Sequence, residues 1–262
     1  MNLIKKITSM QNQTLKNMRA LEQRKTRKEK GLFLAEGLKV IGTARDCNWA
    51  PKILVFEEGT AERGLSYDLV NWALDSGAEV LEITYDLMAR LSSRDNPQTM
   101  MAVFEQRWRQ LPTAGDFWIG LEEVRDPGNL GTIIRTADAA GASGIILIGT
   151  CCDPYSVEGV RSTMGSIFAM PIARASTDAF IEWRKKSWHG RVIATHLDAT
   201  DDYRKDFGAA PHLLLMGSEG PGLSDQLVKL ATHKVKIPMR GQADSLNLSV
   251  ATGLMIYRMQ GL

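Results

Sequence analysis

Two side chains in the segment 126–138 have types and a spacing suited to binding an anion. The segment reads Asp-Pro-Gly-Asn-Leu-Gly-Thr-Ile-Ile-Arg-Thr-Ala-Asp, with Asn129 as the candidate N-cap of a helix and Arg135 six residues further on. In a helix these residues lie within about 120° of one another around the axis. The flat guanidinium of arginine suits bidentate contact with phosphate. The alternative is a surface salt bridge from Arg135 to Asp138 or Asp126.

A second segment combines glycines with one carboxylate. The run 213–224 contains Gly217, Gly220 and Gly222 after four apolar residues. Because glycine has no Cβ, a ligand can approach the backbone closely here. Neither the phosphate loop G-x-x-x-x-G-K-[ST] nor the dinucleotide motif G-x-G-x-x-G is present. A tight turn before a helix is the alternative, but a turn alone does not need Glu219 between two glycines.

A third segment, residues 237–253, begins with Ile-Pro-Met and places polar residues before an apolar helix. Either Asp244 or Ser245 is predicted to cap that helix. Its first turn would then present Ser245, Asn247 and Ser249 beside free backbone N–H groups. The alternative is an ordinary capped helix with a polar first turn.

Short apolar strands alternating with helices must carry these segments. Strands are predicted at 53–56, 79–83, 100–104, 117–121, 144–148, 192–195 and 213–216. Helices are predicted at 11–30, 67–75, 129–140, 223–230 and 245–259. This alternation predicts an α/β fold with a mostly parallel sheet covered by helices on both faces. Ligands of such sheets bind outside the carboxyl ends of the strands, where the polar segments begin.

The charge of the chain is concentrated at its N-terminus. Residues 1–30 carry nine Lys and Arg against two Glu, a net +7, whereas the whole chain of 262 residues carries only +2. The predicted helix 11–30 is therefore strongly basic and ends at Gly31, which indicates an anionic partner. The polar stretch 105–116, with Pro112 and Gly115, is the candidate boundary between two domains.

Composition excludes several classes of protein. An apolar fraction of 44% is typical of a globular chain, and no apolar run reaches the roughly 18 residues of a membrane span. The first ten residues lack a signal-peptide core, so the cytoplasm is the predicted location. Cys47, Cys151 and Cys152 show no zinc spacing and are expected to be reduced. The four scattered histidines form no metal motif, so no metal is expected.

Together the three segments resemble the SpoU (TrmH-like) family of the SPOUT superfamily of RNA methyltransferases. The matching motifs are N-x-G-x-x-x-R-T-A at 129–137, G-x-E-G-x-G at 217–222, and I-P-M at 237–239 followed by S-L-N-x-S at 245–249. Residues 161–166 and Pro171 resemble the family's R-x-S-x-G element, with Thr163 where serine is commoner. The resemblance covers about residues 115–262.

The N-terminal part resembles the L30e/L7Ae-like substrate-binding domain attached to many of these enzymes. The resemblance rests on residues 7–12, 27–29, 33–37 and Pro97-Gln98, with Thr99 where glycine is common. The predicted organisation is an RNA substrate-binding domain at 1–106, a linker at 107–115 and a SPOUT methyltransferase domain at 116–262.

The resemblance implies a function: transfer of a methyl group from S-adenosylmethionine to a ribose 2′-hydroxyl of RNA. Large-subunit ribosomal RNA is the expected substrate, by analogy with other enzymes carrying the added domain. It also implies a trefoil knot threaded through residues 213–249, and a homodimer in which Arg135 reaches the partner's site. The alternatives are a tRNA 2′-O-methyltransferase, a non-catalytic RNA-binding or ribosome-assembly protein of the same fold, and an unrelated nucleotide-binding α/β protein.

The resemblance also implies which residues form the site. The expected cofactor contacts are Thr195, His196, Leu197, Gly217, Ser218, Gly220, Ile237, Met239, Leu246 and Asn247. The expected catalytic residues are Arg135, Asn129, Glu219, Ser245 and Asn247, with the asparagines as positioners and Glu219 as an acceptor for Arg135 or Asn129. The expected RNA contacts are Arg19, Arg24, Lys25, Arg27, Lys28 and Arg135. Neutralising an arginine at pH 7 costs roughly 7–9 kcal/mol, so Arg135 is expected to act as a fixed cation and not as a base.

Overall fold

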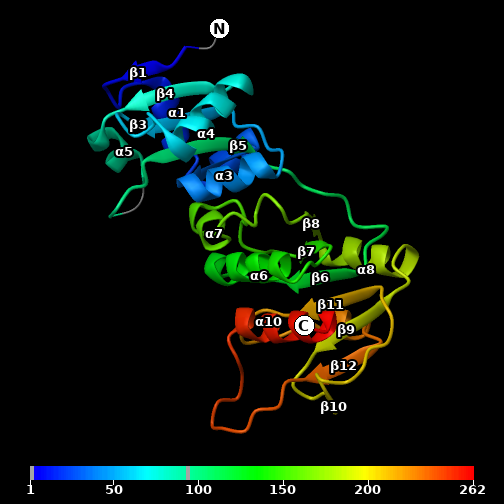
Figure 1. The fold of residues 1–262 in the computed structure, drawn as a ribbon. Coiled ribbons are helices and arrows are strands. Elements are labelled where there is room, and N and C mark those ends of the chain that lie inside the picture. The colour runs from blue at the N-terminus through cyan, green and yellow to red at the C-terminus, as the bar shows by residue number, and fades with distance from the viewer. Residues whose placement is uncertain (1–2, 93–94) are drawn as a thin grey trace. The chain divides into compact units, whose positions relative to one another are not determined.

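The computed structural model describes residues 3–92 and 95–262 and divides the chain into two compact units. The first unit comprises Met1–Gln106 and Asp153–Ala169, and the second comprises Arg107–Cys152 and Met170–Leu262. Each unit is built on its own β-sheet (Figure 1). The predicted organisation placed all of 116–262 in one domain, whereas the structure groups residues 153–169 with the N-terminal part.

The first unit is a five-stranded mixed sheet with the strand order β1-β4-β3-β5-β2. Its strands are β1 (Lys5–Ile7), β2 (Leu32–Glu36), β3 (Ile53–Glu57), β4 (Glu79–Ile83) and β5 (Met100–Glu105). Its helices are α1 (Gln13–Ala20), α2 (Arg24–Lys30), α3 (Leu38–Asp46), α4 (Gly64–Asp75), α5 (Tyr85–Leu91) and α7 (Val157–Ser162). Strands β1, β4 and β3 are mutually parallel, and β5 runs antiparallel between β3 and β2.

The predicted single helix 11–30 is wrong, because the structure forms two helices with a break after Ala20. The guanidinium of Arg27 donates hydrogen bonds to the carbonyl oxygens of Leu21 and Glu22, each at 2.8 Å. These bonds satisfy carbonyl groups that the break would otherwise leave without a helical partner. The predicted stop at Gly31 is confirmed, since Gly31 ends α2 with a φ of 64°, which favours glycine.

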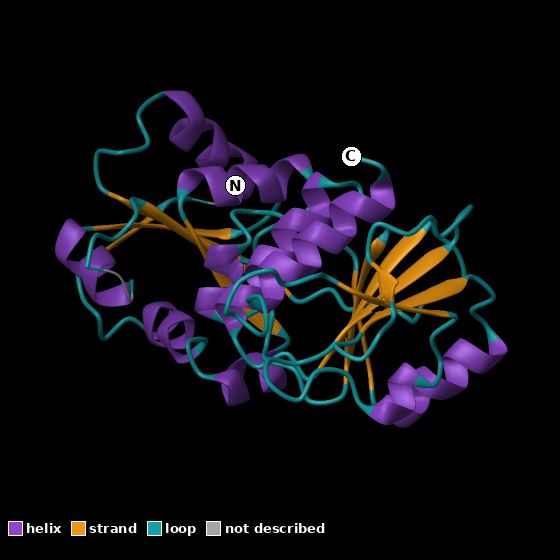
Figure 2. Cartoon of the chain, turned by 90° about the horizontal axis from the view of Figure 1, so that it is seen from below, coloured by secondary structure: helices purple, strands orange, loops and turns teal. Residues whose placement is uncertain are grey.

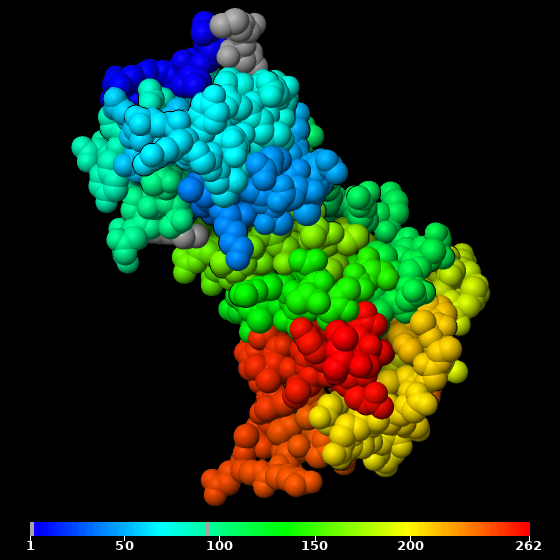
Figure 3. Space-filling view, in the orientation of Figure 1, coloured from blue at the N-terminus to red at the C-terminus, as the bar shows by residue number. Residues whose placement is uncertain are grey.

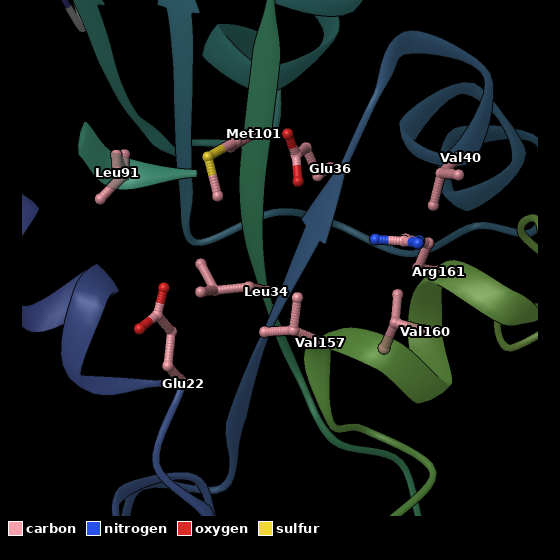
Figure 4. A pocket seen from close by; sticks show the side chains of 9 residues that line it. All are labelled: Glu22, Leu34, Glu36, Val40, Leu91, Met101, Val157, Val160 and Arg161. Carbon is pink, nitrogen blue, oxygen red and sulfur yellow. The ribbon is translucent and has the colours of Figure 1, made fainter. Parts of the chain in front are cut away.

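Residues 153–169 are held to the first unit by a buried ion pair. Nε and Nη2 of Arg27 each lie 2.8 Å from Oδ2 of Asp153, and the two side chains are only 4% and 13% exposed. Val157 of α7 packs against the apolar core of this unit, and Val157 and Val160 line a small pocket together with Leu34 of β2 (Figure 4). Removing a charge from such a pair leaves its partner buried and uncompensated.

An aromatic cluster makes a second attachment of this segment. Phe168 lies 4.9 Å from Phe104 and 5.1 Å from Trp49 between ring centroids, with edge-on geometry in both pairs. The indole N–H of Trp49 donates to the carbonyl oxygen of Phe168 at 2.8 Å. Tyr155 contacts Phe33 at a centroid distance of 4.7 Å. Residues from a distant part of the sequence thus complete the core of the N-terminal unit.

The second unit is a seven-stranded sheet with the order β10-β12-β9-β11-β6-β7-β8, in which every neighbouring pair is parallel. Its strands are β6 (Phe117–Glu122), β7 (Gly144–Ile148), β8 (Ile172–Ala175), β9 (Arg191–Thr195), β10 (Asp201–Asp202), β11 (His212–Met216) and β12 (His233–Lys236). Its helices are α6 (Pro127–Ala139), α8 (Thr177–Lys186), α9 (Asp225–Val228) and α10 (Leu248–Gln260). Each predicted strand falls inside an observed one.

Helices cover both faces of this sheet (Figure 2). Ile146, Leu213 and Leu215 pack with Phe180 and Trp183 of α8 in one apolar cluster. The residues that alternate with them along the strands face away from that cluster, on the side where α10 packs against α6 and β11. The predicted parallel sheet with helices on both faces is therefore confirmed. Among the described residues, no helix has the length and apolar character needed to cross a membrane.

Candidate active site

The three polar segments begin at one edge of the seven-stranded sheet. Strands β6, β11, β9 and β12 are consecutive neighbours and run parallel, so their carboxyl ends share this edge. The segment with Asn129 follows β6, the glycine-containing loop follows β11, and the segment starting at Ile237 follows β12. The edge therefore lies where parallel sheets bind their ligands.

Helix α6 places Asn129 in its first turn without using it as a cap. The N-cap is Asp126, whose Oδ1 accepts from the backbone N–H of Asn129 at 2.6 Å, and Pro127 occupies the first helical position. The prediction of Asn129 as the N-cap is therefore wrong. The Asp-Pro pair was the sequence signal for the true cap, because proline is favoured at the position after it. With the cap supplied by Asp126, the side chain of Asn129 is available for other contacts.

Asn129, Glu219 and Asn247 form a hydrogen-bonded cluster, one residue from each segment. Nδ2 of Asn129 donates to Oε1 of Glu219 at 2.5 Å. Nδ2 of Asn247 donates to Oδ1 of Asn129 at 3.0 Å and to Oε1 of Glu219 at 3.5 Å. Arg135 and Asn129 are the two donors expected for the carboxylate of Glu219. In the structure, the donors are Asn129 and Asn247.

Asn247 also starts the last helix, so the predicted caps Asp244 and Ser245 are wrong. Its Oδ1 accepts from the backbone N–H groups of Ser249 at 2.9 Å and Val250 at 3.3 Å, and α10 begins only at Leu248. Capping uses the oxygen of this side chain and leaves its nitrogen for the cluster. The side chain of Ser245 is exposed and donates to Oδ1 of Asp244 at 3.3 Å. The segment between β12 and α10 stands out from the second unit (Figure 3).

Arg135 lies on α6, six residues or about 1.7 turns beyond Asn129, and is exposed. Within residues 3–92 and 95–262, its guanidinium makes no hydrogen bond or ion pair. The salt bridge that was the alternative for this residue is therefore not formed, and Asp126 uses its Oδ1 to cap the helix. An exposed arginine without a carboxylate partner is available to an anionic ligand.

The loop 217–222 has little space between its ends, where Gly217 approaches Gly222, and open space around Gly220 at its tip. A Cβ on Gly217 would lie 2.0 Å from the carbonyl carbon of Gly222 and 2.1 Å from the nitrogen of Leu223, so only glycine fits there. Gly220 has a φ of 89°, and an added Cβ there would meet no atom within 4 Å. The tip therefore offers free space at the backbone, which a bound ligand can approach closely.

The remaining predicted cofactor residues lie at the same edge. The Oγ1 of Thr195, the last residue of β9, donates to the sulfur of Met216 at 3.3 Å, and the backbone N–H of His196 donates to the carbonyl oxygen of Val235 at 2.9 Å. Exposed apolar side chains occur at Leu197, which is 73% exposed, and Leu246, which is 37% exposed. Ile237 and Met239 are half-buried beyond β12.

This edge fits a ligand that combines an apolar ring with polar groups, as S-adenosylmethionine does. Apolar side chains can cover the adenine ring, and the open backbone around Gly220 can approach the ligand without a phosphate-binding motif. The residues present are thus compatible with this cofactor.

The basic residues expected to contact RNA do not all remain available. Arg19, Arg24, Lys25 and Lys28 are exposed. Arg27 is only 3% exposed, and its guanidinium is committed to Asp153 and to two backbone carbonyl oxygens. The prediction that Arg27 contacts RNA is therefore wrong, because its charge is neutralised inside the first unit. Composition indicated a basic segment but could not distinguish exposed arginines from a buried one.

Comparison with known families agrees with this geometry. Residues 116–257 match the SpoU rRNA Methylase family, and residues 12–102 match the MRM3-like substrate binding domain. The first match covers more than half of the chain. The chain therefore belongs to the SpoU rRNA methylase family, and the resemblance drawn from its motifs is confirmed.

Individual relatives extend over nearly the whole chain. The 23S rRNA (guanosine(2553)-2′-O)-methyltransferase RlmP of Bacillus subtilis is 28% identical, over 98% of this chain and 100% of its own length. The 23S rRNA (uridine(2479)-2′-O)-methyltransferase of Streptomyces viridochromogenes is 32% identical, over 90% of this chain and 85% of its own. The crystal structure of an AdoMet-bound rRNA methyltransferase from Sinorhizobium meliloti has a TM-score of 0.91 at 44% identity and covers 98% of both chains.

Proposed function

We propose that this protein methylates a ribose 2′-hydroxyl of large-subunit ribosomal RNA, with S-adenosylmethionine as the methyl donor. The observation that carries the proposal is the Asn129–Glu219–Asn247 cluster, which joins three separate segments. Arg135, six residues beyond Asn129 on α6, makes no ion pair with any residue that the structure describes. Two relatives that span most of the chain are named as 23S rRNA 2′-O-methyltransferases. A fold neighbour with 44% identity is an AdoMet-bound rRNA methyltransferase.

The difficulty of this reaction lies in its nucleophile, a neutral hydroxyl group. When bound, the cofactor supplies an electrophilic methyl group on its sulfonium. The chain's part is to align the ribose oxygen and to stabilise the negative charge that develops on it. Arg135 serves as a fixed cation for this charge and for an adjacent phosphate. The proton passes to solvent or to an RNA phosphate, since an arginine is too basic to accept it at pH 7.

The cluster and its neighbours act as positioners. Glu219 fixes the amide of Asn129, and Asn247 fixes the other end of that amide, so the three side chains hold one arrangement. Ser245 is exposed on the segment leading to Asn247 and offers its hydroxyl to the target ribose. Thr195–Leu197, Gly217–Gly220, Ile237–Met239 and Leu246–Asn247 hold the cofactor.

The working form of the enzyme is a homodimer. Helix α10 leaves Val250, Leu254 and Tyr257 between 40% and 52% exposed, at the spacing of one helix face. An apolar face of this kind is suited to burial against a second copy. In that assembly Arg135 of one protomer serves the site of its partner. We also propose that residues 213–249 thread the trefoil knot of the superfamily.

The two parts of the chain divide recognition from chemistry. Residues 1–106 bind the RNA through Arg19, Arg24, Lys25 and Lys28. Residues 107–115, which begin the second unit, connect them to the methyltransferase domain 116–262. Within that domain, the second unit carries out the transfer and 153–169 complete the first unit. The match of residues 12–102 to a substrate-binding domain supports this division. We also place the enzyme in the cytoplasm.

Methyl transfer from labelled S-adenosylmethionine to purified RNA tests the proposal. Ribosomal RNA lacking its own 2′-O-methyl groups and tRNA from the same cells are offered separately, and the labelled nucleotide is identified after digestion. Label on a ribose of large-subunit RNA is the expected result. Label on tRNA alone would reassign the substrate, and cofactor binding without transfer would favour a non-catalytic RNA-binding protein.

A further inference from the structure

We infer that Glu122 is a positioning residue that fixes the glycine loop 217–222, and with it Glu219, against the turn that carries Asn129. Glu122 is the last residue of β6 and is only 5% exposed. Its Oε2 accepts from the backbone N–H of Ser224 at 2.7 Å, and its Oε1 accepts from the hydroxyl of Ser224 at 2.6 Å. The inference rests on the methyl transfer proposed above.

The environment of Glu122 is unusual for a carboxylate. Among residues 3–92 and 95–262, no lysine or arginine forms an ion pair with it, although its side chain is buried. A buried carboxylate is costly to desolvate unless hydrogen bonds compensate it. Here both oxygens are directed to a single residue, Ser224, which also caps α9. Among the described residues, the hydrogen bonds that compensate the buried carboxylate thus all come from Ser224, just beyond the glycine loop.

Glu122 lies where two of the motif segments meet. In the parallel pairing of β11 with β6, Met216 is opposite Leu121, so the glycine loop leaves the sheet beside Glu122. The backbone N–H of Gly222 donates to the carbonyl oxygen of Ser218 at 3.1 Å and holds the two ends of the loop together, and Leu223 is buried in the apolar cluster. The contact with Ser224 then ties the outgoing end of the loop to β6.

This connection determines the spacing of the catalytic cluster. Along the chain, Glu122 is followed by the cap Asp126 and then by Asn129. Through its contact with Ser224, Glu122 also anchors the loop that carries Glu219. A hydrogen bond of 2.5 Å between Asn129 and Glu219 requires these two segments to keep one relative position. Glu122 touches neither residue and acts through Ser224.

Two substitutions of similar size separate this role from simple burial. Glu122→Gln can still accept from the backbone N–H of Ser224 and can donate to its hydroxyl, so both contacts survive. Glu122→Leu can make neither contact, and the backbone N–H and the hydroxyl of Ser224 both lose their acceptor. We expect the Gln variant to stay within about threefold of the parent in its Kd for S-adenosylmethionine and in kcat. We expect the Leu variant to bind the cofactor about tenfold or more weakly and to lose kcat to a similar degree.

Calorimetric titration with S-adenosylmethionine is the primary measurement, because it reports on the loop without requiring turnover. The KM for RNA should stay unchanged, since the basic residues proposed to bind RNA in the first unit are unaltered. Glu182→Leu is the control: it removes a carboxylate of α8 whose side chain is 63% exposed and pairs with Lys186, and it should leave the cofactor Kd and kcat unchanged. A role limited to stability would lower the melting temperature of the Leu variant but leave the cofactor Kd of the folded protein unaltered, and that result would overturn the inference.

If Glu122→Leu does not fold, Ser224→Ala provides the second test. It removes the hydroxyl contact with Glu122 together with the side-chain cap of α9, and should raise the cofactor Kd about threefold to tenfold. Ser224→Thr, which keeps a hydroxyl for both contacts, should bind the cofactor like the parent. A Kd of the Ser224→Ala variant equal to that of the parent would overturn the inference. If the parent binds the cofactor but methylates no RNA, the proposed function fails, while the comparison of cofactor Kd values still decides the role of Glu122.

Discussion

Asn129 donates its side-chain amide to Glu219 over 2.5 Å, although 90 positions separate the two residues in the chain. Asn247 donates to both of them from the start of α10. Each of the three motif segments thus contributes one side chain whose orientation depends on the other two. A disturbance in one segment should therefore change the behaviour of the whole cluster.

Substitution of Glu219 tests this dependence. Glu219→Ala removes the acceptor of two amide donors, and hydrogen bonds to charged groups contribute about 1.5–3 kcal/mol. We expect kcat/KM to fall about 10- to 100-fold, while Glu219→Gln, which keeps one acceptor oxygen, should fall between this variant and the parent. Steady-state methyl transfer gives the measurement. Asp225→Ala, an exposed carboxylate at the start of α9, is the control and should retain full activity.

Arg135→Lys tests whether the shape of the cation matters. Lysine keeps the charge but has no planar fork for bidentate contact with a phosphate. We expect at least about tenfold loss of turnover, the size of effect typical of a lost charge-stabilising donor, with a change of no more than about threefold in the Kd for S-adenosylmethionine. Arg125→Lys, in the exposed turn before α6, should behave like the parent. Parent-like turnover of the Arg135 variant would contradict the role given to this residue.

The exposed basic residues of the first unit should determine the salt dependence of RNA binding. Each phosphate contact contributes roughly 0.7–0.9 to the slope of log affinity against log salt concentration. Replacing Arg24, Lys25 and Lys28 by glutamine should therefore flatten that slope by about 2. A filter-binding series at several salt concentrations measures it. The same change at three exposed lysines of the second unit, Lys185, Lys186 and Lys229, is the control, and equal slopes for both variants would place the RNA contact elsewhere.

The buried pair of Arg27 and Asp153 should be important for the stability of the first unit. Asp153→Asn leaves the guanidinium of Arg27 buried without a counter-charge, and breaking such pairs typically costs about 3–5 kcal/mol. Denaturant unfolding, followed by far-ultraviolet circular dichroism, measures the change in the free energy of unfolding. Glu29→Gln breaks the exposed Lys25–Glu29 pair and should cost less than about 1 kcal/mol. A loss of that same small size for Asp153→Asn would show that the pair is not stabilising.

Local patterns located the three motif segments and seven of the strands in the described residues, but they missed β1, β2, β8, β10 and β12. Apolar runs such as 144–148 are buried throughout, so their character is visible without knowing their neighbours. Errors arose where a contact from a distant part of the chain decided the outcome. At the break between α1 and α2, Arg27 donates to the free carbonyl groups, and the carboxylate partner of Arg27 lies 126 positions away in the chain.

In the candidate site, too, local patterns predicted some features, whereas contacts between distant residues decided others. Motif spacing indicated which segments meet, because the carboxyl ends of parallel strands share an edge. It could not show which side chain would cap each helix, and the caps proved to be Asp126 and Asn247. Nor could it reveal Glu122, since a glutamate at the end of an apolar strand has no distinguishing pattern until Ser224 is seen beside it.

The division of the first unit into two stretches of sequence has a consequence for synthesis. Translation proceeds from the N-terminus, and domains generally fold as units while the chain emerges. Residues up to Gln106 emerge first, yet the carboxylate of Asp153 and the ring of Phe168 follow only after 107–152, which belong to the other unit. Until then Arg27 has no counter-charge, and the aromatic cluster lacks Tyr155 and Phe168. The nascent first unit must therefore wait until residues 107–152 have been synthesised, and we expect a ribosome that stalls within that stretch to hold an incompletely folded intermediate that is prone to aggregate.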